Sequence, residues 1–228
     1  MRRRWLLLGL FALPAGVAAA CGTFESESAP GADGGVDVDP PDGAGGADGS
    51  RPTDAGVDSA ADATDPAKKR IFLSTSVFTG DLSTQAAAFG LAGDAAAPDR
   101  LCGREAAVVG LSDGGGRWVA YVSFGGVATP AARMSDKGAR YDVTGAKIIP
   151  AVGSSPSGPI RFADGRLPDG GHAWTGTTNL GVAAIENCGG WTSDGQSGVW
   201  GDPTSPASWA SSASVACSNP AHLYCLED

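Results

Sequence analysis

The sequence predicts a loop-rich α+β domain held together by disulfide bonds, and three observations support this class. An even number of cysteines remains after a targeting signal, which in an exported protein indicates a disulfide framework. Helix-like and strand-like patterns both occur between residues 70 and 124. From 125 to 220, glycine, proline, serine, asparagine and aspartate recur every few positions, which predicts long loops and short strands. The cysteines are Cys102, Cys188, Cys217 and Cys225, and their spacing alone allows three pairings.

The segment 1–20 has the composition of a signal peptide. Arginines at positions 2–4 precede an apolar stretch over residues 5–20, which is shorter than the roughly 20 apolar residues of an ordinary membrane span. Cleavage after this stretch would make Cys21 the first residue of the mature chain. A cysteine at that position resembles a bacterial lipobox, and the resemblance implies that two or more acyl chains anchor Cys21 in a membrane. The alternative is plain secretion with an unpaired Cys21.

Residues 21–67 form an acidic tether that we expect to be disordered. Aspartate, glycine, alanine, proline and serine dominate it, so burial cannot recover the cost of ordering the backbone. Eleven carboxylates against the single base Arg51 give it a charge of −10, whereas residues 68–228 carry 12 bases and 14 carboxylates, a net −2. The acidity of the chain therefore belongs to the tether, which we interpret as a spacer, and it is no reason to expect a basic partner.

The folded domain is expected over residues 68–228, and its first half contains two clear patterns. Residues 70–78 are rich in β-branched and aromatic side chains and predict a strand. Residues 98–109 predict a helix, because a proline is tolerated in its first turn and Gly110 follows where a C-terminal cap belongs.

Two later segments alternate between apolar and other side chains. Residues 117–124 place Trp118 and three further apolar side chains on one side of a predicted strand. A final strand over 222–226 places Leu223 and Cys225 on one side and directs His222 to the outward side.

The closing cysteines resemble those of C-type-lectin-like domains. In that family two cysteines separated by seven residues end on an apolar C-terminal strand, as Cys217 and Cys225 do here. The family pairs its outer two cysteines with each other and likewise its inner two. The resemblance therefore implies a C-type-lectin-like fold with two nested disulfides, Cys102–Cys225 and Cys188–Cys217.

The endostatin-like branch of this family is the closer likeness. The resembling segments are Gly90-Leu91-Ala92-Gly93-Asp94, the Cys102 helix, Gly110-Leu111 through Ser123, Trp174-Thr175-Gly176, Cys188-Gly189-Gly190-Trp191, and the ending at Glu227. Myxobacterial and spirochaete surface lipoproteins carry a domain of unknown function with the same order of motifs. The chain resembles these proteins over residues 70–228.

The likeness does not extend to the metal sites of the family. The Glu-Pro-Asn or Gln-Pro-Asp triplet of calcium-dependent sugar binding is absent, and the segment Gly198–Asp202, which resembles a second calcium motif, ends 15 residues before Cys217. The N-terminal histidine zinc site of endostatin has no counterpart, and the bases that might bind heparin are scattered. We therefore expect no metal and no other cofactor.

The sequence contains no strong pattern of catalytic residues. Only two histidines occur, His172 and His222, and no Gly-x-Ser-x-Gly elbow presents a nucleophile to either. The glycine-rich run over 112–117 lacks the Lys-Ser/Thr of a phosphate loop, so we interpret it as a turn. The nearly neutral domain argues against nucleic-acid binding. We predict that the protein is not an enzyme.

The loop-rich segment 187–209 is the predicted recognition surface, because long loops on a rigid scaffold commonly carry binding. Its tryptophans could stack on a sugar or clasp a peptide, and the alternative is that they fill a second small core. We expect a lipid-anchored envelope protein, on the outer membrane, that recognises a glycan, matrix component or envelope partner; the alternatives are a structural surface antigen without a defined ligand or, third, a hydrolase. The candidate ligand-binding residues are Asn187, Trp191, Asp194, Gln196, Trp200 and Asp202.

Overall fold

The computed structural model describes residues 67–111, 116–125 and 128–228. The predicted signal peptide, the lipidation site Cys21, the tether up to residue 66, and residues 112–115 of the glycine-rich run lie outside these ranges. Within them, no helix is long and apolar enough to cross a membrane.

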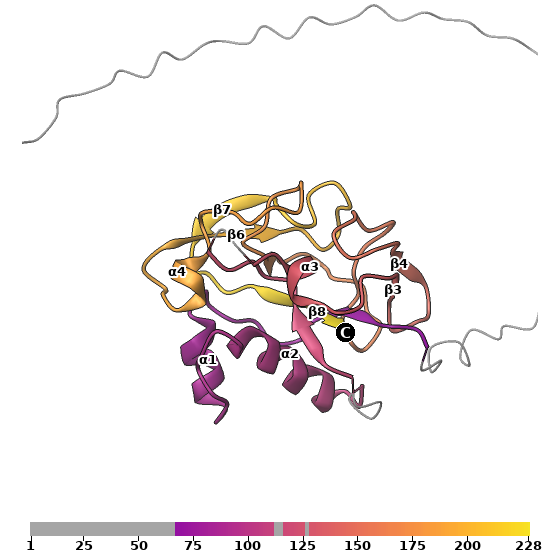
Figure 1. Ribbon diagram of the computed structural model, residues 1–228, viewed down its shortest axis with the longest axis horizontal. Coiled ribbons are helices and arrows are strands. Elements are labelled where there is room, and N and C mark those ends of the chain that lie inside the picture. Colours follow the sequence, from indigo (N-terminus) through magenta and orange to yellow (C-terminus); the bar gives the residue numbers. More distant parts are fainter. Residues whose placement is uncertain (1–66, 112–115, 126–127) are drawn as a thin grey trace, which may run out of the picture. The chain divides into compact units, whose positions relative to one another are not determined.

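A mixed sheet of six strands forms the centre of the domain (Figure 1). Its last strand, β8, runs antiparallel to β1 and β2 and parallel to β5, and β6 and β7 continue the sheet beyond β5. The strands are β1 (Ile71–Leu73), β2 (Trp118–Ala120), β5 (Ala173–Trp174), β6 (Ser197–Gly201), β7 (Ala213–Ala216) and β8 (His222–Glu227). The end of the sequence is therefore the central strand of the fold.

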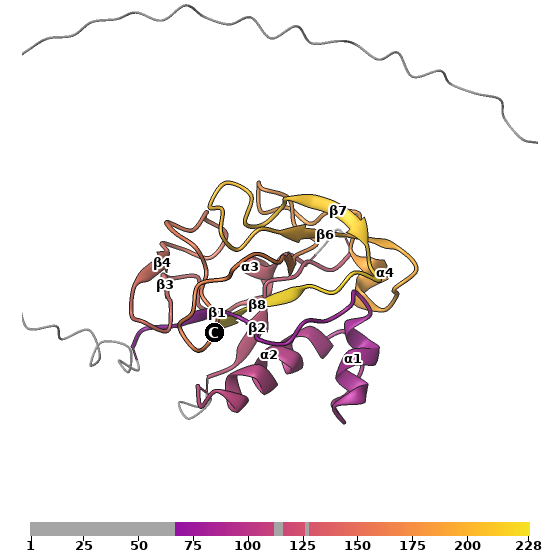
Figure 2. The same ribbon diagram turned by 180° about the vertical axis from the view of Figure 1, so that it is seen from behind.

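Two helices, α1 (Leu82–Ala88) and α2 (Ala97–Val108), lie side by side on one face of this sheet, as both views of the ribbon show (Figures 1 and 2). The predicted helix 98–109 corresponds to α2. Gly110 follows it in the left-handed region, at φ +73°, and the amides of Gly110 and Leu111 bond back to the last turn, which is the hydrogen-bond pattern of a Schellman cap. The sequence analysis did not predict α1.

The remaining elements are short. A separate two-stranded sheet pairs β3 (Arg140–Tyr141) with β4 (Lys147–Ile149). Two single turns, α3 (Pro130–Arg133) and α4 (Cys188–Trp191), interrupt the loops. This agrees with the predicted long loops, although the segment expected as loop over 187–209 contains the strand β6.

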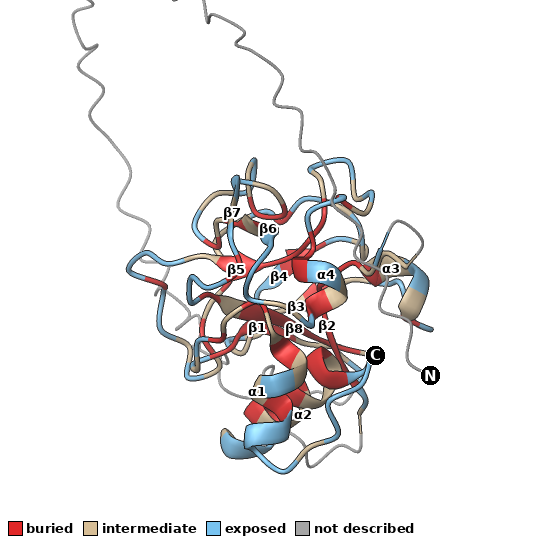
Figure 3. Ribbon diagram, turned by 90° about the vertical axis from the view of Figure 1, so that its left-hand side faces the viewer, coloured by how far each residue is buried: buried red, intermediate tan, exposed pale blue. Residues whose placement is uncertain are grey.

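Buried side chains form two cores, one on each side of the central strand. The helix-side core includes α1, α2 and both disulfides; its main members are Phe72, Phe78, Leu82, Leu101, Cys102, Trp118, Trp174, Cys188, Trp191, Cys217, Leu223 and Cys225. The loop-side core is covered by loops and the β3–β4 pair; its main members are Ile71, Leu73, Val119, Tyr121, Ile149, Ile160, Phe162, Trp209, Tyr224 and Leu226. Figure 3 shows buried residues concentrated on the strands and exposed residues on the outer faces of the helices.

The alternation predicted for the final strand is correct, but the predicted outward side is not. Leu223 and Cys225 enter the helix-side core, whereas Tyr224 and Leu226 enter the loop-side core and are fully buried. His222 lies on the same side as Tyr224 and is half-buried. An outward face was expected because alternation cannot reveal that a strand is covered on both sides.

Two disulfides cross-link the helix-side core. Cys102 on α2 bonds to Cys225 on β8, over a sequence separation of 123 residues, and Cys188 on α4 bonds to Cys217, over 29 residues. These are the nested pairs that the family resemblance implied. The predicted α+β class is confirmed, with strands predominating and a few helices.

Candidate functional site

The six predicted ligand-binding residues do not form one site. Asn187 and Trp191 are 6% and 1% exposed, so neither can meet a ligand at the surface, and the placement of both on a recognition surface was wrong. The Trp191 indole donates a hydrogen bond to the Ser123 carbonyl oxygen at 2.8 Å, and its ring packs edge-on against Trp174. Trp191 therefore takes the core role that the sequence analysis had given as the alternative.

Trp191 reaches the core because α4 is a left-handed turn. All four of its residues have positive φ: Cys188 at 55°, Gly189 at 63°, Gly190 at 72° and Trp191 at 67°. The two glycines adopt this region freely, but each of the other two residues costs roughly 1–2 kcal/mol. The Cys188–Cys217 disulfide and the buried indole hold these two residues in place, and the Asn187 side chain caps the turn by accepting from the Gly190 amide at 2.9 Å.

Asp194 and Gln196 are exposed and lie beside this turn. The Asp194 carboxylate accepts a hydrogen bond from the Asp81 amide at 2.9 Å, just before α1. Gln196 stands over Gly189, where a Cβ would approach its amide nitrogen to 3.0 Å. Asp194 thus ties the chain after α4 to the start of α1, and Gln196 packs close to the backbone of α4. They are separated from Asp202 by the length of β6, which at the rise of a strand is about 20 Å between Gln196 and Asp202.

Trp200 is the one predicted tryptophan that remains half-buried at the surface. His172 stacks on its indole, with ring centroids 4.1 Å apart and planes 15° from parallel. The ring of the fully buried Trp174 packs against the Trp200 indole, with ring centroids 5.7 Å apart. On β7, the residue paired with Trp200 is the small, exposed Ala213. An aromatic pair with one rigid support and one small neighbour is suited to stacking on a flat ligand.

His172 was not among the predicted site residues. Its place beside Trp200 follows from the pairing of β5 with β6, which sets Trp174 opposite Trp200. His172 is two residues before Trp174 and therefore lies on the same face of the sheet. Each ring also has a buried nitrogen without a hydrogen-bond partner, Nδ1 of His172 and Nε1 of Trp200. Unpartnered buried polar atoms are uncommon in folded proteins and ask for an explanation. No pattern in the sequence could have identified this pair, because the two residues are 28 positions apart.

Asp202 follows Trp200 and is half-buried. Its carboxylate accepts from the Thr204 amide at 2.8 Å and from the Thr204 hydroxyl at 2.6 Å, so it fixes the turn after β6. The candidate site is therefore the Trp200 surface, which we define as the stacked pair His172 and Trp200. The Asp202 carboxylate instead lies close enough to the buried Tyr224 hydroxyl of the loop-side core to help raise its pKa.

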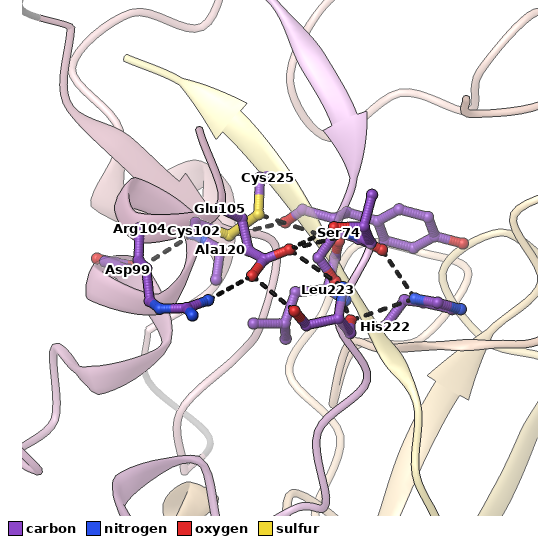
Figure 4. The surroundings of a disulfide bond; sticks show 12 residues. Ser74, Asp99, Cys102, Arg104, Glu105, Ala120, His222, Leu223 and Cys225 are labelled. Atoms are coloured by element: carbon purple, nitrogen blue, oxygen red, sulfur yellow. Dashed lines mark hydrogen bonds and ion pairs between the residues drawn. A yellow bond between two sulfur atoms is a disulfide. The ribbon is translucent and has the colours of Figure 1, made fainter. Parts of the chain in front are cut away.

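The other histidine, His222, belongs to a buried polar network behind the Cys102–Cys225 disulfide (Figure 4). Its Nδ1 lies 2.8 Å from the carbonyl oxygen of Ser74 and 3.3 Å from that of Ser76. Because carbonyl oxygens only accept, Nδ1 is the protonated, donating nitrogen. Burial lowers the pKa of His222, and the two carbonyl contacts only partly offset that effect.

Glu105 on α2 completes this network. Its carboxylate accepts hydrogen bonds from the amides of Thr75 and Ser76, both at 3.1 Å, and from both hydroxyl groups, and Arg104 pairs with it at 2.9 Å. These contacts turn the chain away from the sheet after Leu73. They explain why the strand predicted over 70–78 ends as early as β1 does.

The two histidines lie on opposite faces of the sheet. Ala173 pairs with His222 across β5 and β8, so the preceding residue, His172, alternates to the other face. Neither imidazole hydrogen-bonds a serine hydroxyl or a carboxylate within the described residues. In the same ranges no group of three histidine, cysteine or carboxylate side chains could hold a metal ion.

Comparison with known proteins places the chain in no family. No protein-family model matches the sequence, and no curated protein matches it either.

Proposed function

We propose that this chain is a lipid-anchored envelope protein whose C-terminal domain is a C-type-lectin-like, endostatin-like recognition module without catalytic activity. Acylation at Cys21 would hold it on the outer membrane, and the acidic tether would carry the domain away from the bilayer. The ligand would be a glycan, a matrix component or another envelope partner.

The fold assignment is supported by the nested disulfides. The outer bridge, Cys102–Cys225, ties the first long helix to the last strand, and the inner bridge, Cys188–Cys217, ties the loop layer to the chain just before that strand. The cysteine pairing thus agrees with the pairing that the resemblance implies.

The Trp200 surface is the observation that carries the recognition proposal. It consists of a stacked aromatic pair that Trp174 in the core supports. Recognition sites commonly combine a rigid aromatic platform with a few polar groups, because the ring is ordered before binding and loses little entropy.

A glycan and matrix-protein array probed with residues 22–228 tests this function. We expect the protein to bind a ligand on the array. Its affinity for that ligand should fall at least about tenfold in Trp200→Ala, as for the aromatic centre of an interface. Ile185→Ala is the matched control, because Ile185 is 94% exposed and its truncation removes apolar surface elsewhere. Binding should survive a chelator, and loss of binding on chelation would contradict the proposed metal-free recognition.

A structural surface antigen without a ligand is the second candidate, and one observation favours it. The other four tryptophans of the domain, at positions 118, 174, 191 and 209, are each at most 5% exposed and fill the cores. If the native chain binds nothing on the array, or if Trp200→Ala and Ile185→Ala bind equally well, this second role is the better description.

A further inference from the structure

The outermost strand of the central sheet, β7, has one uncovered edge. The order of the strands gives β7 a single neighbour, β6, and both views of the ribbon place it on the outer side of the domain (Figures 1 and 2). Ala213, Ser214 and Ala216 are exposed, and Val215 is half-buried. The open edge of a strand carries N–H and C=O groups that can pair with a further strand.

The backbone groups of Ser214 face this open edge. Ser214 lies opposite Val199 on β6. The Val199 amide donates to the Glu186 carbonyl oxygen at 3.1 Å, and the Val199 carbonyl oxygen accepts from the Thr175 amide at 3.0 Å, so both groups of Val199 face away from β7. Because bonded and non-bonded pairs alternate in an antiparallel ladder, Ser214 directs both its N–H and its C=O outward.

The same alternation orients the residues two positions away. The Ala216 amide faces the edge, whereas its carbonyl oxygen accepts from the amide and the side chain of Asn219, both at 3.0 Å. At the other end, the Ser212 amide bends back to the Trp200 carbonyl oxygen at 2.8 Å, which leaves the Ser212 carbonyl oxygen for the edge. The donors of the edge are therefore the amides of Ser214 and Ala216, and its acceptors are the carbonyl oxygens of Ser212 and Ser214. None of these groups bonds to another described residue outside the β6–β7 ladder.

This set of groups is complementary to itself. Two copies of β7 that run antiparallel about a two-fold axis at Ser214 place Ser214 opposite Ser214 of the other copy, and Ala216 opposite Ser212 of the other copy. The Ser214 amide then donates to the Ser214 carbonyl oxygen across the axis, and the Ala216 amide donates to the Ser212 carbonyl oxygen, in both directions. Every donor of the edge meets an acceptor, and no group that is already bonded within the domain is needed.

The composition of this region does not oppose an identical neighbour. Residues 203–226 contain no lysine, arginine, aspartate or glutamate, so two copies bring no like charges together at β7. Proteins commonly protect their edge strands with charges, prolines or bulges. In β7 there is no charge and no proline, and its register with β6 is continuous from Ala213 to Ala216. An uncharged edge gives a charged peptide no advantage, which favours a second copy of the chain as the occupant.

We propose that two copies of this domain associate through β7, antiparallel about a two-fold axis at Ser214, and form one continuous sheet. The axis is perpendicular to the sheet, so the two Trp200 surfaces lie on the same side of it. From the spacing of strands and the rise per residue, the Cα atoms of the two Trp200 residues are about 16 Å apart. This last consequence rests on the proposed function, because it lets a ligand with repeated units meet both surfaces at once.

Sedimentation equilibrium of residues 22–228 tests the association itself, without any ligand, so its outcome is independent of the recognition proposal. A buffer with about 0.15 M salt screens the acidic tethers of the two copies from each other. Because a short strand supplies few hydrogen bonds, we expect a weak dimer with a Kd of about 0.1–1 mM. A native chain that remains monomeric at about 1 mM, a concentration at or above that Kd, would overturn the proposal.

Charged residues at the axis test the register. Ser214→Glu and Ser214→Lys each set two like charges opposite one another, so each variant alone should dimerise about fivefold more weakly than the native chain. An equimolar mixture of the two variants should recover the association, because it sets a carboxylate opposite an ammonium group. Ser155→Glu, at an exposed loop position, is the matched control and should dimerise like the native chain.

Two results with these variants would contradict the proposed pairing. One is a dimer that Ser214→Glu leaves unchanged, which would place the contact elsewhere on the domain. The other is a mixture that associates no better than either variant alone, which would show that Ser214 does not lie opposite itself. Near-UV circular dichroism of each variant shows that its fold is retained, so that a loss of association reports on the strand edge.

Discussion

The helix-side core and the loop-side core lie on opposite sides of β8 and are stabilised differently. Both disulfides lie in the helix-side core, where α2, α4 and β8 bring together positions far apart in the sequence. The loop-side core has no disulfide among the described residues and depends on packed aromatic rings and a few internal hydrogen bonds. Disulfide bonds thus stabilise the core on the face of the sheet that the helices cover. Side-chain packing stabilises the core on the other face.

The aromatic cluster of the loop-side core shows how packing replaces cross-linking. Trp209 lies between Tyr121, at 4.4 Å, and Tyr224, at 5.6 Å, and its carbonyl oxygen accepts from the Tyr224 hydroxyl at 2.9 Å. The backbone of Trp209 also passes directly over β6, where a Cβ on Gly201 would come within 1.6 Å of the Trp209 carbonyl oxygen. A residue larger than glycine at this position would displace the loop that delivers Trp209 to the core.

Reduction of the disulfides should have the largest effect. Closing loops of 123 and 29 residues is worth about 5 and 3.5 kcal/mol in the chain-entropy model, which together approach the whole stability of a small domain. We expect the reduced domain to unfold, as measured by loss of near-UV circular dichroism. Cys102→Ala/Cys225→Ala should destabilise more than Cys188→Ala/Cys217→Ala, and retention of the full near-UV signal in reductant would show that packing alone suffices.

Removal of the central aromatic ring should have the second largest effect, this time in the loop-side core. Trp209 is 3% exposed, so we expect Trp209→Ala to lower the free energy of unfolding by about 3–5 kcal/mol in the oxidised protein, as measured by denaturant titration. Trp209→Phe keeps a ring in the cluster and is the matched control with a smaller loss. If Trp209→Ala cost less than about 1 kcal/mol, the loop-side core would not be an independent source of stability.

The smallest effect should be a pH dependence from His222. Because burial lowers its pKa in the folded state, the unfolded chain takes up a proton first as the pH falls below about 6.5. The contribution of neutral His222 to stability is therefore complete above about pH 6.5 and is lost as the pH falls through the folded-state pKa. His222→Asn retains a donor for the Ser74 carbonyl oxygen but does not titrate, so its stability should be flatter between about pH 7.5 and 5.5 in denaturant titrations. The same decline in both proteins would assign the effect to other groups.

Local chemistry made several features predictable. Gly110 ends α2 because a glycine in the left-handed region satisfies the last carbonyl groups of a helix. The alternation in Trp118–Phe124 and in the final strand was correct because a strand repeats every two residues. The pairing of Cys102 with Cys225 came from the family resemblance and not from spacing, which left three alternatives open.

The sequence by itself thus determined the α+β class, the even set of cysteines, the helix after Pro98 and the strand that closes the chain, since each depends on neighbouring residues. Only the tertiary structure decided that β8 is covered on both faces, that α4 is left-handed and directs Trp191 inward, and that His172 meets Trp200. These features depend on contacts between residues distant in the chain, and the free energy of such contacts leaves no periodic pattern in a single sequence.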